Sequence, residues 1–104
     1  MTRYSNDRAL ASFAADVHLA AASVPTFERF GDDLVFISDV WDAFPCWSLS
    51  RERFDELLVA ASCAGLVWLR RADLVQEMPE GKVRSSRVER DGVVRHFVVL
   101  PEGR

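Results

Sequence analysis

The stretch LSRERFDELLVAASCAGLVWL, residues 49–69, carries the strongest structural signal in this chain. Ser50 is a candidate N-cap, because its hydroxyl can accept a hydrogen bond from a free backbone N–H of the first helical turn. Leu49 and Phe54 have the spacing of a hydrophobic staple across that cap. Apolar residues then recur at helical spacing. We therefore expect a helix that begins at Arg51.

The end of this helix is marked as clearly as its start. Gly65 stands where a residue with positive φ closes a helix, and Leu66 follows as the apolar residue that usually accompanies such a glycine. The sequence predicts a helix over residues 51–64 and a strand over residues 66–69.

The N-terminal part predicts three further elements. Apolar residues form one stripe over residues 7–22, which indicates a helix, and Pro25 limits its extension. Residues 34–37 have the character of a short strand. Ser38 is a candidate cap for a second helix over residues 39–44.

The C-terminal part predicts a hairpin. The Asp-Gly pair at residues 91–92 favours a type I′ turn between strands at residues 87–90 and 93–100. Residues 70–81 connect this hairpin to the preceding strand and predict a helical turn followed by a loop at residues 79–81.

The aromatic residues divide between core and surface. We expect Trp41 and Trp68 in the core, because they lie in regular elements. Phe27 and Phe30 are expected to cover the core from a loop. Trp47 lies in a turn, where it either covers the core or is exposed as an anchor for a partner.

This order of elements resembles the winged helix-turn-helix domain, over roughly residues 7–100. The resemblance implies one α+β domain over residues 1–104, with a three-helix core, a short strand and a C-terminal β-hairpin. It also implies that the helix at residues 51–64 lies against a DNA groove and that the hairpin acts as a wing. The connection at residues 70–81 departs from the pattern, since a simple wing follows its strand directly.

Charge is distributed unevenly along the chain. The net charge is −3, which disfavours nonspecific binding of nucleic acid by the whole surface. Residues 1–81 carry seven basic and thirteen acidic side chains, a net charge of −6. Residues 82–96 carry five basic and two acidic side chains, a net charge of +3. The basic C-terminal part is the candidate electrostatic contact.

The first functional hypothesis is a non-enzymatic DNA-binding or DNA-associated regulator. Basic side chains of the hairpin would contact phosphates, and those at the start of the helix would contact bases or the backbone. The candidate nucleic-acid contacts are Arg51, Arg53, Lys82, Arg84, Arg87, Arg90 and Arg95.

The alternative hypothesis is a winged-helix subunit or adaptor that binds another protein. Carboxylates on the exposed face of the helix would meet DNA phosphates unfavourably but suit a basic protein surface. The candidate partner contacts are Trp47, Glu52, Asp55 and Glu56. A homodimer is a further expectation, and the sequence alone leaves these partners open.

Other function classes have little support. Cys46 and Cys63 are not in a CxxC arrangement, so we expect two small buried thiols and neither a disulfide nor a zinc site. His18 and His96 lie far apart in the sequence, and the chain has no glycine-rich phosphate loop. We therefore expect no catalytic residues, metal or cofactor. The apolar runs are too short to span a membrane, which predicts a cytoplasmic protein.

Overall fold

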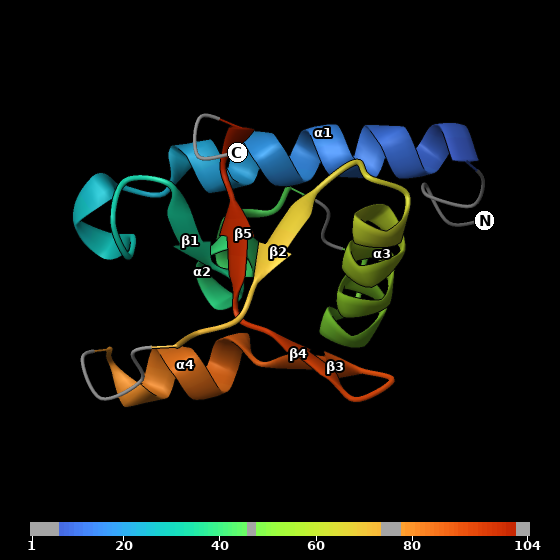
Figure 1. The fold of residues 1–104 in the computed structure, drawn as a ribbon. Coiled ribbons are helices and arrows are strands. Elements are labelled where there is room, and N and C mark those ends of the chain that lie inside the picture. The colour runs from blue at the N-terminus through green and yellow to red at the C-terminus, as the bar shows by residue number, and fades with distance from the viewer. Residues whose placement is uncertain (1–6, 46–47, 74–77, 102–104) are drawn as a thin grey trace.

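The structure is a computed structural model, and it describes residues 7–45, 48–73 and 78–101. It has an α+β fold with two small antiparallel sheets (Figure 1). The elements in chain order are α1 (Asp7–Ser23), the 3₁₀ helix η1 (Thr26–Glu28), β1 (Leu34–Phe36), α2 (Ile37–Ala43), α3 (Arg51–Cys63), β2 (Trp68–Arg70), α4 (Glu80–Ser86), β3 (Val88–Arg90), β4 (Val93–Arg95) and β5 (Phe97–Val99). None of the described helices is long and apolar enough to cross a bilayer.

The larger sheet has the strand order β1-β5-β2, so the last strand of the chain lies between two earlier ones. Val98 of β5 is opposite Val35 of β1 and Leu69 of β2. Successive side chains of a strand point to opposite faces. This row and the neighbouring row around Phe97 therefore contribute to different clusters of buried side chains.

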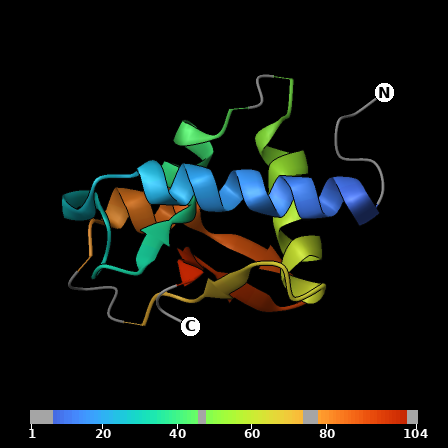
Figure 2. The same cartoon turned by 90° about the horizontal axis from the view of Figure 1, so that it is seen from above.

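The main core lies between one face of the sheet and the first three helices. Helix α1 runs across one side of the molecule and contacts both α2 and α3 (Figures 1 and 2). Phe13 of α1 and Phe54 of α3 are fully buried and meet edge to face, with 5.6 Å between ring centroids. Burial of such large apolar side chains supplies most of the favourable energy of folding.

A second, smaller core lies on the other face of the sheet. Phe36 and Phe97 pack there with 4.7 Å between their ring centroids. Ala72 and Met78 are buried in the same cluster, and Val83 of α4 packs against it. Helix α4 is therefore tied to the sheet through apolar contacts.

Both ends of α3 confirm the sequence prediction. The Ser50 hydroxyl oxygen accepts a hydrogen bond of 3.1 Å from the backbone N–H of Arg53. At the other end Gly65 has a φ of 76°, and its N–H bonds to the carbonyl of Ser62 at 3.0 Å. The N–H of Leu66 reaches the carbonyl of Ala61 at 2.9 Å. This pair of bonds is a Schellman motif. The strand that follows begins at Trp68, two residues later than predicted.

The predicted cap of the second helix is wrong. Helix α2 begins at Ile37, and its N-cap residue Phe36 makes no side-chain cap. Ser38 lies inside the helix, where its backbone N–H donates to the hydroxyl of Ser86 at 3.0 Å. The Ile37 N–H donates to the carbonyl of His96 at 3.0 Å. Tertiary hydrogen bonds therefore replace the local cap.

The region before the hairpin also differs from the prediction. The expected loop at residues 79–81 is the start of α4, with Pro79 as the N-cap residue, a position that tolerates proline's missing N–H. Most of the helical segment expected over residues 72–78 lies outside the described residues, which leave out 74–77. Lys82 and Arg84 consequently lie on α4 and not on the hairpin.

The predicted final strand is divided in two. Residues up to Arg95 pair with β3, whereas β5 joins the larger sheet, with His96 between them. Val93-Val94 precede Arg95-His96 and Phe97-Val98-Val99 follow them with no intervening glycine or proline, so the sequence pattern predicts one continuous strand. The hairpin is therefore shorter than expected.

Several burial predictions are also corrected. Trp41 packs against the main core as expected, but Trp68 is 48% exposed. Phe30 packs against the second core, whereas Phe27 lies on η1 and is 85% exposed. Cys63, expected to be buried, is an exposed free thiol, because it faces outward in the last turn of α3.

Candidate interaction surface

Helix α3, helix α4 and the β3–β4 hairpin meet on one side of the molecule (Figure 1). A hydrogen bond of 2.8 Å from the Arg51 guanidinium to the carbonyl of Ser85 joins the start of α3 to α4. We call residues 51–63 and 80–95 the α3–hairpin surface. All seven predicted nucleic-acid contacts lie within it: Arg51 and Arg53 on α3, Lys82 and Arg84 on α4, Arg87 between α4 and β3, Arg90 on β3 and Arg95 on β4.

The hairpin has the predicted turn. Asp91 and Gly92 have φ values of 54° and 79°, as a type I′ turn requires. Val88 pairs with Arg95, and Arg90 pairs with Val93 across the two strands. Val88, Arg90, Val93 and Arg95 therefore share one face of the hairpin, because paired residues and residues two apart in a strand lie on the same face.

The two basic residues at the start of α3 are bound by acids one turn later. The Arg51 Nε lies 2.8 Å from an Asp55 carboxylate oxygen. Arg53 lies 3.1 Å from a Glu56 carboxylate oxygen. Helix geometry brings residues three and four apart together, so these pairs follow from the sequence spacing. Glu52 is exposed, as predicted.

The two cations of the surface that lie on α4 are also paired. Lys82 lies 2.8 Å from Asp39 of α2, and its ammonium is 5.7 Å from the centroid of the Phe36 ring. Arg84 lies 2.8 Å from Glu80, one turn earlier on α4.

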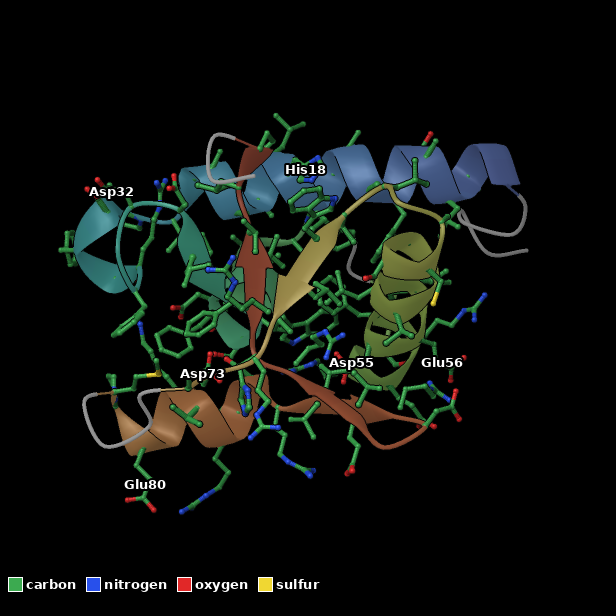
Figure 3. All side chains as sticks on the ribbon, in the orientation of Figure 1. His18, Asp32, Asp55, Glu56, Asp73 and Glu80 are labelled. Carbon is green, nitrogen blue, oxygen red and sulfur yellow. The ribbon has the colours of Figure 1, made fainter. Side chains whose placement is uncertain are left out.

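An ion pair also forms where the hairpin begins. Arg87 lies 2.9 Å from Glu89. Glu80 points away from the sheet (Figure 3). Asp55 and Glu56 lie in the N-terminal half of α3, which is the half near the hairpin (Figure 3).

Four arginines near the hairpin form no ion pair with any described residue. Arg90 and Arg95 belong to the hairpin, and Arg70 and Arg71 lie at and just after the end of β2. Arg95 uses one N–H of its guanidinium on the carbonyl of Val94, at 3.1 Å. Nothing in the sequence connects Arg70 and Arg71 with the hairpin, because only the fold brings them near it.

Asp55 is the acid most affected by its surroundings. Partial burial raises its pKa above the usual 3.8, because water stabilises the carboxylate better than the protein does. The hydrogen bond and charge of Arg51, and then the charge of Arg90, oppose this effect. Asp55, on α3, is therefore close enough to the hairpin for the charge of Arg90 to influence its pKa.

His96 lies at the point where the hairpin leaves the larger sheet. It is buried, and its pKa is lowered from 6.5, first by desolvation and then by the charges of Arg87 and Arg71. Arg87 directly follows α4 and Arg71 directly follows β2. Both lie close enough to the imidazole of His96 to lower its pKa. The effect favours a neutral His96.

A narrow groove of about 200 Å³ runs between α3, β2 and the hairpin. Its apolar walls are formed by Val59, Leu69, Val88 and Val93. Its polar positions are Ser62, Cys63, Arg90, Asp91 and Arg95. Val93 is 45% exposed, so part of this apolar wall is accessible to solvent. Apolar walls with a charged margin are typical of a protein-binding site.

Two other cavities differ from this groove in how their charged side chains are used. One, of about 690 Å³, lies between α1 and the loop before β1, near His18 and Asp32 (Figure 3). Arg29 lines it but donates to the backbone carbonyls of residues 22, 24 and 32, so its guanidinium is committed to the fold. The other, between α2, α3 and α4, contains Lys82 and Arg51, which are already paired.

The predicted partner contacts are only partly brought together. Asp55 and Glu56 lie on the α3–hairpin surface beside Glu52, whereas Trp47 lies outside the described residues. Within the described part of the chain no three His, Cys, Asp or Glu side chains form a group suited to a metal ion.

Comparison with known protein families, curated proteins and solved structures finds no match to this chain. The geometry of the α3–hairpin surface is therefore the basis for assigning a function.

Proposed function

We propose that this chain is a non-enzymatic binding module of the winged-helix type that contacts a protein partner through its α3–hairpin surface. Support for the winged-helix type comes from the arrangement of the first three helices against one sheet face and from the strand order β1-β5-β2. Helix α4 and the hairpin occupy the connection where a simple wing would be.

The charge balance of the surface favours a protein over DNA as the partner. Residues 51–63 and 80–95 hold seven basic and six acidic side chains, a net charge of +1. Five of the seven cations are within ion-pair distance of a carboxylate. DNA binding gains most of its nonspecific affinity from an excess of cations that displaces counterions, and this surface has almost none. Mixed charge around an apolar groove instead favours a protein partner.

DNA is the second candidate, because Arg70, Arg71, Arg90 and Arg95 form no ion pair among the described residues. These side chains could contact phosphates without first breaking a pair. Such contacts would weaken steeply with salt.

The two candidates are separated by titrating the full chain with a mixed-sequence DNA duplex at low and at physiological salt. The protein-binding proposal predicts no binding at physiological salt. Binding that persists there, and whose salt dependence falls by about one contact for each of Arg90→Ala and Arg95→Ala, would instead establish the DNA candidate.

A positive test uses nuclease-treated lysate of the source cells. The wild-type chain is expected to retain a partner, Val93→Asp to lose it, and Leu19→Asp to keep it. Leu19 is a matched control, since it is an exposed apolar residue on α1, outside the surface. Equal retention by all three proteins would remove the α3–hairpin surface from the contact.

A further inference from the structure

The groove between α3, β2 and the hairpin suggests the chemistry of the partner. We infer that it receives an apolar side chain from an acidic segment of a partner protein. This inference rests on the proposed function and specifies the ligand of the same surface.

The size of the groove favours a side chain over a small molecule. Its volume of about 200 Å³ is below the roughly 300–1,000 Å³ of typical small-molecule pockets. Single aromatic or aliphatic anchors that fill such pockets dominate the energy of many protein interfaces. The walls formed by Val59, Leu69, Val88 and Val93 offer such an anchor apolar contact.

The margin of the groove favours an acidic segment. Arg90 and Arg95 line it, and neither is within 4.0 Å of a carboxylate in the described part of the chain. Asp91 is the one acid among the groove residues. Two guanidiniums with free donors can bind carboxylates on either side of an apolar anchor, often through two hydrogen bonds at once.

Position within the fold strengthens the argument. Strand β2 pairs only with β5 among the described strands, and its residue Leu69 lines the groove. The groove is thus formed by three separate elements, α3, β2 and the hairpin, each of which is fixed to the core. A preformed site of this kind binds without a large cost of ordering.

The test uses three short fluorescent peptides, in which leucine alternates with aspartate, leucine alternates with lysine, and serine alternates with aspartate. Only the aspartate–leucine peptide is expected to bind. Val93→Asp, and Arg90→Glu combined with Arg95→Glu, should each weaken that binding at least about tenfold. Leu19→Asp, and Arg70→Glu combined with Arg71→Glu, are the matched controls, because these residues lie outside the α3–hairpin surface and do not line the groove; they should leave the affinity within about twofold.

Cys63 provides a direct report on occupancy, because this exposed thiol lines the groove. In a Cys46→Ser background, the aspartate–leucine peptide should slow the reaction of Cys63 with a disulfide reagent. Unchanged Cys63 reactivity with bound peptide would place the peptide elsewhere and overturn the inference.

The outcomes also separate this inference from the proposed function. If only the lysine–leucine peptide binds, or none of the three does, the acidic-segment inference is overturned. The proposed function still stands in that case if the chain retains a partner from nuclease-treated lysate. DNA binding that persists at physiological salt overturns the proposed function itself. Circular dichroism of each variant confirms that the exposed substitutions leave the fold intact.

Discussion

The backbone N–H of Ala72 donates a hydrogen bond of 3.0 Å to the imidazole Nδ1 of His96. The His96 backbone also donates to the Arg70 carbonyl at 2.8 Å and accepts from the Ile37 N–H at 3.0 Å. One residue therefore joins the end of β2, the start of α2 and the point where β4 gives way to β5. Its position sets where the hairpin leaves the sheet.

Stability should fall as the pH drops through about 6.5, because His96 has a lowered pKa in the folded state. The unfolded chain takes up a proton near pH 6.5, whereas the folded chain resists it until a lower pH, so acid favours unfolding. Urea unfolding at a series of pH values measures the slope.

His96→Asn is the informative variant, since its amide oxygen can still accept from Ala72 but does not titrate. It should flatten the slope, and the same change at His18 separates the contribution of the second histidine. An unaltered slope in His96→Asn would show that another group is responsible.

Phe54→Ala should destabilise the protein by about 3–5 kcal/mol, through lost burial and the cavity that remains. The Phe54 ring contacts those of Phe13, Trp41 and Phe44 at centroid distances of 5.1 to 5.6 Å. Phe27→Ala is the control, and its 85% exposed ring predicts a change within about 0.5 kcal/mol. Chemical denaturation compares the two, and similar values would contradict this division between core and surface.

Two glycine substitutions should have opposite signs. Gly65→Ala should cost about 1 kcal/mol, because φ at Gly65 is 76° and a Cβ atom disfavours that conformation even in open space. Gly81→Ala should stabilise by up to about 1 kcal/mol, because Gly81 lies in α4 with no atom close to an added Cβ. Thermal midpoints that shift in the same direction would refute the assigned helix end or α4 itself.

Ser86→Ala should cost about 1–3 kcal/mol, since it leaves the Ser38 N–H without its acceptor. The Ser86 hydroxyl also donates to the Ser38 hydroxyl at 2.9 Å. Ser85→Ala is the adjacent control, and its exposed side chain predicts a change within about 0.5 kcal/mol. If urea unfolding showed equal effects, the contact between α2 and α4 would contribute nothing to stability.

Local sequence determined the elements whose signals lie within a few residues. Ser50 caps α3 with its own side chain, Gly65 ends that helix through its own φ, and Asp91-Gly92 turns the hairpin. The ion pairs of Arg51 and Arg53 follow from helical spacing alone. In each case both partners of the interaction are separated by less than about two helical turns, so no knowledge of the fold was needed.

Tertiary structure alone decided the rest, because the deciding partners are distant in sequence. Ser38 could cap α2 locally but bonds Ser86, 48 residues away. His96 lies between two strands of different sheets and bonds Ala72, 24 residues away. The groove likewise needs α3, β2 and the hairpin together. Residue types and spacings fix local hydrogen bonds and charge, whereas the packing of distant segments decides which charges are paired and which apolar side chains remain exposed.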